Sequence, residues 1–221
     1  MTDLADIVAA RRSVRGFFRD RPVPREVIER ALRVAQLAPS NCNAQPWRVW
    51  ILSGEARDSL SQAMCAAMDS GDLGNPEDPI DSFFDEYRRL QIACGAAMYG
   101  AMGIERGDVA GRIMAHRRNY ELFDAPHVAI VAMDRRFGIG VAVDIGAWLQ
   151  TFMLALADEG VGSCAQAALR QYPTIVRGAI GADDGMRLLF GVSFGYEDPS
   201  VPANATRQLR EPLETTTTWL G

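Results

Sequence analysis

The sequence predicts an α+β fold in which helices flank a mixed, mainly antiparallel sheet. Two observations support this. Apolar residues recur at helical spacing over several stretches that proline or glycine bounds. Between these stretches lie short apolar segments with the length of strands, at 47–52, 127–133, 160–165 and 187–195. A length of 221 residues suits one domain or one large compact subunit.

The expected helices of the N-terminal half are bounded by capping or helix-breaking residues. They are 3–11 with Thr2 as its cap, 24–38 with Pro24 in its first turn and Pro39 after its end, and one that begins at Ser53-Gly54 after the first strand. Glycines and prolines among acidic residues indicate a loop at 69–81.

The C-terminal half repeats this pattern. Its expected helices are 83–102 with Ser82 and Asp85 as a capping box and Gly103 after its end, one from Asp108 to about Asn119, 141–158, and 173–180 with Pro173 at its start. The 141–158 helix is apolar almost all round, which predicts burial in a core or a subunit interface. From Tyr196 onward prolines prevent long helices, and four threonines at 215–218 favour an extended chain. Such a tail is expected to be disordered or to lie along another subunit, and its arginines and Trp219 favour the second.

Composition excludes several classes of function. A net charge of −5 argues against a nucleic-acid surface. All 23 positive residues are arginines, so lysine chemistry is excluded. The four cysteines form no Cys-x-x-Cys, which predicts free thiols in a reducing compartment, the cytoplasm. The N-terminus does not read as a signal peptide, and no membrane span is expected because Asp144 and Gln150 interrupt the most apolar segment.

Three polar motifs, far apart in the chain, carry the candidate chemistry. Arg11-Arg12-Ser13-Val14-Arg15 packs three guanidinium groups and a hydroxyl into five residues, which are donors suited to a phosphate and to polar ring edges. The stretch at 39–47, Pro-Ser-Asn-Cys-Asn-Ala-Gln-Pro-Trp, is turn chemistry that runs into a strand, as binding loops do. The third motif, 207–212, is Arg-Gln-Leu-Arg-Glu-Pro in the tail. An arginine run alone is more often a solvated surface, so the combination indicates a site.

Together these motifs resemble the FMN-dependent nitroreductase family, over nearly the whole chain. The sequence is similar in particular to nitrobenzoate-reductase-like members, which share Arg-Gly-Asp (106–108), Phe-Asp-Ala-Pro (123–126) and Gln-Ala-Ala (166–168). The resemblance implies a single domain over 1–221 and an intertwined homodimer. In that dimer the C-terminal arm, 196–221, is exchanged, and each FMN site draws on two chains.

The resemblance also implies a role for each polar motif. Arg11, Arg12 and Ser13 would hold the phosphate and ribityl end of FMN, joined by the tail arginines. Arg15 would face N1 and O2 of the isoalloxazine ring, where a fixed positive charge favours the anionic reduced flavin. The loop at 39–43 would contact the flavin held mainly by the partner. The expected cofactor contacts are Arg11, Arg12, Ser13, Arg15, Pro39, Ser40, Asn41, Asn43, Ala167, Ala168, Arg207 and Arg210.

Small residues at 160–168 allow a close backbone approach to a ligand. In the family this stretch lays backbone N–H groups against flavin N5 and O4, which Ala167 and Ala168 would do here. The chain departs from many relatives in having Ala165 where a proline is usual. From the residues alone, a glycine-rich strand end is an equally good interpretation.

The helices at 83–120 are expected to cover the flavin, although a plain surface layer would have the same pattern. Tyr87, Met98 and Tyr99 are the candidate substrate contacts, because flat acceptors stack against such side chains. Arginine pairs at 88–89 and 117–118 would give the cover a positive rim that favours carboxylated nitroaromatics.

The implied activity is NADH- or NADPH-dependent reduction of nitroaromatics or similar flat, electron-poor small molecules, with ping-pong kinetics. Reductive dehalogenation and quinone reduction are alternatives on the same scaffold, and a flavin-binding protein without turnover is a further one. No side chain is expected to act as nucleophile or essential base, since the flavin carries the chemistry.

Two other patterns are dismissed on physical grounds. Gly-Val-Ser-Phe-Gly at 191–195 fits the nucleophile elbow of hydrolases, but 196–199 cannot start the required helix and both histidines precede Ser193. His116 and His127 lack ligand spacing, so both are expected to be structural and no metal site is predicted.

Overall fold

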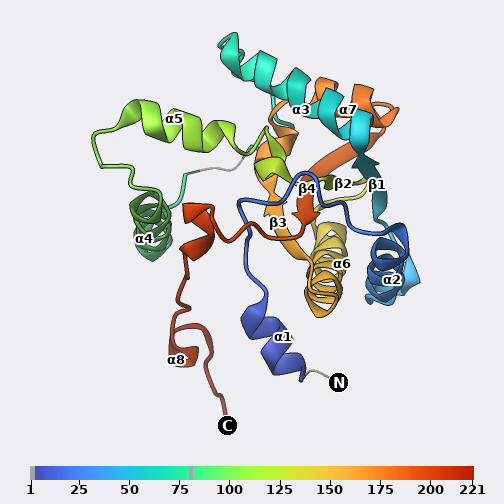
Figure 1. Cartoon of the computed structure of the whole chain (residues 1–221). Helices are drawn as coiled ribbons and strands as arrows, with labels where there is room; N and C mark the ends of the chain where they lie inside the picture. Colours follow the sequence, from blue (N-terminus) through green and yellow to red (C-terminus); the bar gives the residue numbers. More distant parts are fainter. Residues whose placement is uncertain (1–2, 80–81) are drawn as a thin grey trace.

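The computed structural model describes residues 3–79 and 82–221 and has an α+β fold, with helices on both faces of one sheet (Figure 1). The sheet order is β1-β2-β4-β3, and all three described strand pairings are antiparallel. The strands are β1 (Arg48–Ser53), β2 (His127–Asp134), β3 (Gly162–Gln166) and β4 (Met186–Gly195). A parallel contact is made only by an isolated bridge between Ser13 and Ser163 in the described chain. The predicted fold class is thus confirmed.

The two central strands place apolar side chains on both faces of the sheet. Along β2, Ala129, Val131 and Met133 join the core on one face, and the alternate residues join the core on the other. Helices α2 (Arg25–Ala35) and α6 (Ile139–Asp158) cover the first face, while α3 (Gly54–Asp69) and α7 (Pro173–Ile180) cover the second (Figure 1). Burial on both faces explains why β2 is continuously hydrophobic.

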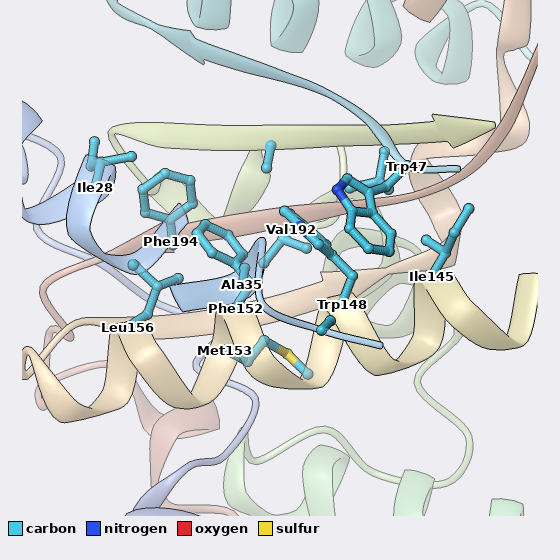
Figure 2. Packing of buried hydrophobic residues seen from close by; sticks show 14 of the residues in the cluster. Ile28, Ala35, Trp47, Ile145, Trp148, Phe152, Met153, Leu156, Val192 and Phe194 are labelled. Carbon is cyan, nitrogen blue, oxygen red and sulfur yellow. The ribbon is translucent and has the colours of Figure 1, made fainter. Parts of the chain in front are cut away.

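Aromatic side chains join α6 to the sheet, as Figure 2 shows. Trp148 and Phe152 stack with ring centroids 5.1 Å apart, and Phe152 meets Phe194 of β4 edge-on at 5.8 Å. The opposite face of α6 is bare, with Ile139 84% and Val143 71% exposed. By length and composition α6 is the one described helix that could cross a membrane, so Asp144 and Gln150 do not by themselves exclude a span. A core helix can pass the same test, and the inner face of α6 packs in the core.

Several helix ends differ from prediction. Helix α1 (Leu4–Ala10) is capped by Asp3, whose side chain accepts the Ala5 N–H, while the predicted cap Thr2 lies outside the described residues. Helix α2 ends three residues before the predicted Ala38, because the chain already turns at Gln36. Helix α4 (Asp85–Ala101) begins after Phe84 without a side-chain cap, so the predicted Ser82–Asp85 capping box was wrong. Helix α5 (Val109–Arg117) is capped by Asp108 as predicted, and it ends two residues before the predicted Asn119.

The rest of the chain is arranged around the strand ends. Helices α4 and α5 lie beside the sheet, and the tail leaves the body in an extended path (Figure 1). The tail contains only short helical turns, η4 (Pro202–Ala205) and α8 (Leu213–Thr216), in the described residues. Two of the four threonines expected to be extended are therefore helical. The other short turns are η1 (Asn41–Asn43), η2 (Leu122–Asp124) and η3 (Ala167–Gln171).

Candidate functional site

The arginine run at 11–15 lies along the free edge of β3. The Val14 N–H donates to the Ser163 carbonyl at 3.0 Å. Gly162 permits this approach, because a Cβ at that position would lie only 2.9 Å from Val14 Cγ2. The small residues that predict close approach to a ligand therefore also have a packing role within the chain.

The five predicted cofactor arginines differ in their ionic partners. Arg12 is paired with Glu197 through both carboxylate oxygens, and its Nε is buried without a hydrogen-bond partner. The other four have no carboxylate within ion-pair distance in the described ranges, and they are Arg11, Arg15, Arg207 and Arg210. Arg11 and Arg15 are also half-buried. Half-buried guanidinium groups without counter-charges are suited to an anionic ligand.

Two cavities flank this run. One, of about 180 Å³, is bounded by Arg11, Arg12, the Gly160–Ser163 stretch and Glu197. The other, of about 240 Å³, has Arg15 in its wall and is otherwise mostly apolar. Its remaining lining residues are Met98, Tyr99, Met102, Ala115, His116, Arg118, Asn119, Phe123, Val201, Pro202 and Ala203. We call it the Arg15 cavity.

The predicted substrate contacts divide at this cavity. Met98 and Tyr99 of α4 line it, and Arg112 lies over the Tyr99 ring with its Cζ 5.5 Å from the centroid. Tyr87, near the start of the same helix, is half exposed, packs edge-on against Phe84 and is not in the cavity wall. Within one chain the three residues therefore do not form one surface.

The arginine pair 117–118 does not form the predicted positive rim. Arg117 is bonded to Asp69 and Glu121, and Arg118 to Glu121 and Asp124 at 2.7 Å each. These carboxylates neutralise both guanidinium groups locally. Arg89 of the other pair contacts Glu211 at 3.0 Å.

The loop at 39–45 is exposed and has an unusual backbone. Cys42, Asn43 and Gln45 have φ of 51°, 55° and 46°, in the left-handed region that non-glycine residues seldom adopt. The loop is held by the Asn41 N–H, which donates to Asp144 of α6 at 3.0 Å, and by the Ser40 hydroxyl, which accepts the Gln45 N–H at 3.0 Å. No hydrogen bond or ion pair links it to the run at 11–15 in the described residues. Such local strain is typical of functional loops.

Ala167 and Ala168 begin η3, directly after β3, and both are half-buried. The preceding Gln166 accepts the hydroxyl of Ser193 and donates to the Asn119 carbonyl at 2.9 Å. Ser193 is fully buried within β4, and this bond occupies its hydroxyl. The Gly-x-Ser-x-Gly pattern is therefore a strand sequence, as predicted.

The two histidines differ. His127 is buried, accepts the Val23 N–H at Nε2 (2.9 Å), and contacts the Ser53 hydroxyl through Nδ1. Because Nε2 accepts a hydrogen bond, it carries no proton and the ring is neutral. Burial lowers the pKa of His127. His116 lies in the wall of the Arg15 cavity, with Nε2 3.4 Å from the Tyr120 hydroxyl. Burial raises the pKa of Tyr120 to about 12.

The cavity also contains a feature that sequence reasoning missed. Leu122, Phe123 and Asp124 have φ of 59°, 53° and 63°, and this turn places Phe123 in the cavity wall. The buried Arg57 holds the turn by donating to the Ala125 carbonyl at 2.8 Å and the Glu121 carbonyl at 2.6 Å. Phe-Asp-Ala-Pro at 123–126 was noted only as a motif shared with the family, and nothing in the sequence linked it to this turn or to Arg57.

A model of the Nitroreductase family matches residues 8–196. The chain belongs to this family. It is 33% identical over 221 residues to a 4-nitrobenzoate reductase of Nocardioides sp. (strain LMS-CY), which covers 97% of this chain and 88% of the relative. Its structure is similar to that of the FMN and NADPH-dependent nitroreductase NfnB from sphigopyxis sp. strain HMH, with a TM-score of 0.96, 34% identity and full coverage of both chains. The FMN-dependent nitroreductase NfnB from Mycobacterium smegmatis, solved in complex with NADPH, gives a TM-score of 0.94 at 33% identity, over 99% of this chain and 100% of the other. The family expected from the three motifs is thus confirmed.

Proposed function

We propose that this nitroreductase-family chain is an NAD(P)H-dependent FMN oxidoreductase that reduces nitroaromatic or similar flat, electron-poor acceptors. The observation that carries the proposal is the full-length match to nitroreductases described as FMN- and NADPH-dependent. The match covers the whole of this chain and therefore spans the positions of all three polar motifs. It therefore supports a shared cofactor as well as a shared fold.

The residues present fit FMN. The half-buried Arg11 and Arg15 lack counter-charges in the described chain, and Arg12 has a buried Nε without a partner. These groups supply donors for a phosphate and for polar ring edges. When bound, FMN would take hydride from NAD(P)H and pass reducing equivalents to the acceptor. Arg11, Ser13 and Arg210 would hold the phosphate, and Arg15 would fix a positive charge at the pyrimidine edge of the ring.

Three observations support an intertwined homodimer over 1–221. The outer face of α6 exposes Ile139 and Val143, and α1 exposes Leu4 and Val8. The tail exposes Leu209, Leu213, Trp219 and Leu220. The loop at 39–43 and the run at 11–15 are not connected within one chain. A second chain would bury these surfaces, receive the arm 196–221 and bring the loop to the partner's flavin.

We further propose that the Arg15 cavity admits part of the acceptor. Its Met98 and Tyr99 walls, on the helical cover 83–120, suit a flat aromatic ring. The neutralised pair 117–118 provides no preference for carboxylated acceptors. The four cysteines are free in the described structure, which supports a reducing compartment such as the cytoplasm.

The test is a steady-state assay of NADPH and NADH oxidation. The acceptors are 4-nitrobenzoate, nitrobenzene, a benzoquinone and an iodophenol. We expect nitroaromatic-dependent oxidation of at least one nicotinamide, with parallel double-reciprocal lines for a ping-pong reaction. Faster turnover of the benzoquinone than of the nitroaromatics would indicate a quinone reductase. Release of iodide from the iodophenol would indicate a reductive dehalogenase. FMN binding without turnover of any acceptor would indicate a non-catalytic flavin-binding protein.

A further inference from the structure

Asn204, at the beginning of the tail, is buried and makes three hydrogen bonds with its side chain. Its Oδ1 accepts the backbone N–H of Arg15 at 2.7 Å. Its Nδ2 donates to the Gly16 carbonyl at 2.9 Å and to the Asp198 carbonyl at 2.8 Å. One amide group therefore joins the arginine run to the segment from which the tail departs.

Several hydrogen bonds hold the backbone around Arg15. Asn204 makes its bonds through its side chain, whereas the others join backbone groups. Val14 donates to Ser163, Phe17 to the Phe123 carbonyl at 3.1 Å, and Asp198 donates to Gly16 at 3.0 Å, all between backbone groups. In the described chain no other side chain outside the run hydrogen-bonds the backbone of residues 14–17. Changing Asn204 is therefore the most direct way to release the Arg15 backbone without touching the arginine.

The same turn closes on Arg15 from the side. Val201 packs on Gly16 so tightly that a Cβ at Gly16 would lie 2.5 Å from the valine side chain. Val201, Pro202 and Ala203 also line the Arg15 cavity. The Arg15 guanidinium itself has only the Ser13 carbonyl as a described hydrogen-bond acceptor, at 3.3 Å. Its direction therefore depends on where the backbone is held.

We propose that Asn204 is a positioning residue that fixes Arg15 against the flavin ring and couples this position to the path of the C-terminal arm. The inference rests on the proposed function. Arg207 and Arg210 follow Asn204 by three and six residues. When the arm engages the partner, the turn that carries Asn204 is held from the tail side. The charge at the flavin ring is then set by the same residues that anchor the arm.

Asparagine suits this place because it offers an acceptor and two donors at once. In Asn204→Ala the Arg15 N–H loses its acceptor, and two buried carbonyls lose a donor. In Asn204→Asp the acceptor remains, but the second oxygen faces the carbonyls of Gly16 and Asp198. The aspartate also introduces a negative charge close to Arg15. Both changes weaken the effect of the Arg15 charge on the flavin ring. The alanine leaves the guanidinium less firmly positioned, and the aspartate also offsets part of its charge, so its effect is stronger.

The experiment measures the two-electron potential and FMN dissociation constant of the dimeric holoprotein in the wild type, Asn204→Ala, Asn204→Asp, Arg15→Gln and the Asn204→Ala/Arg15→Gln double variant. Ser61→Ala is the matched control, because it also removes a buried side-chain bond to a carbonyl, that of Tyr120 at 2.8 Å. Hydrogen exchange of the Arg15 amide is followed in parallel. That readout does not depend on flavin.

We expect Asn204→Ala to lower the potential, weaken FMN binding about two- to tenfold, as for one hydrogen bond, and speed exchange of the Arg15 amide. Asn204→Asp should lower the potential further, and Ser61→Ala should leave it unchanged. In the Arg15→Gln background, Asn204→Ala should shift the potential little, because the charge it positions is gone. An equal shift in both backgrounds, or an unchanged potential in Asn204→Ala, would overturn the inference alone. Absence of FMN binding by the wild type would overturn the proposed function and the inference with it.

Discussion

Glu197 binds Arg12 through both carboxylate oxygens and so fastens the start of the tail to the N-terminal arginine run. Both side chains are only partly exposed, at 30% and 24%. This pair engages one amino group of Arg12. Arg11 and Arg210 belong to the four cofactor arginines that have no counter-charge in the described chain, and they are therefore the clearest candidates for the phosphate.

Arg11→Ala and Arg210→Ala should each weaken FMN binding by about 1.5–3 kcal/mol, the value of a charge-assisted hydrogen bond. Arg12→Ala should weaken binding and also lower the melting temperature, since it leaves Glu197 partly buried without its partner. Fluorescence titration of the apoprotein with FMN gives the binding change. Arg25→Ala is the control, because Arg25 is exposed on α2 and paired with Glu29. Equal weakening by Arg25→Ala would refute the phosphate assignment.

Removal of residues 207–221 should abolish both the dimer and FMN binding. The truncation keeps Asn204 and the three hydrogen bonds of its side chain, so it removes the arm without opening the body. The remaining chain would expose the outer face of α6, which lacks a cover in the described chain. Analytical ultracentrifugation and flavin absorption report the two effects. A flavin-loaded monomer would contradict the shared site.

Tyr99→Ala should change the ratio of kcat/KM between nitroaromatic acceptors while FMN content stays close to that of the wild type. Tyr99 lines the Arg15 cavity, and an aromatic pair contributes about 0.5–1.5 kcal/mol. Tyr87→Ala is the matched comparison on the same helix, because Tyr87 lies outside that cavity in one chain. A larger change in acceptor preference for Tyr87→Ala would show that a surface completed by the partner, rather than the cavity, selects the acceptor.

The free energy of unfolding should fall as pH drops below about 6.5, the usual histidine pKa, in part because of His127. Burial lowers the pKa of His127 in the folded state, so the unfolded chain binds this proton first and is favoured as pH falls. His127→Gln removes this contribution. Urea unfolding at about pH 7.5 and about pH 5.5 should show a smaller loss of stability in the variant than in the wild type. An identical loss of stability in both proteins would show that groups other than His127 cause the pH dependence.

The sequence predicted the strands to within two residues because both central strands are buried on two faces and therefore read as continuous apolar runs. Helix α7 was predicted without error, since Pro173 and Gly181 mark its ends. The start of α4 was not, because Phe84 is extended and Asp85, the aspartate that suggested a capping box, has a positive φ of 44°. Local polar spacing does not reveal such a turn.

The candidate site was only partly predictable. Arg11, Arg15, Met98 and Tyr99 could be found from motifs and helical patterns. Asn204 and Arg57 act through backbone groups 189 and up to 68 residues away along the chain. No periodicity or spacing relates such residues to the site. The ion pair of Arg117 with Asp69, 48 residues earlier in the chain, likewise depends on a tertiary contact, which a count of charges along the sequence misses.

Anaerobic addition of NADPH to the purified dimer, followed by visible absorption, tests the central claim most directly. We predict one FMN per subunit, bleaching of its absorption by NADPH or NADH, and return of the oxidised spectrum when a nitroaromatic is added. A protein that is colourless and takes up no added FMN, or whose bound FMN is not reduced by either nicotinamide, would contradict the account.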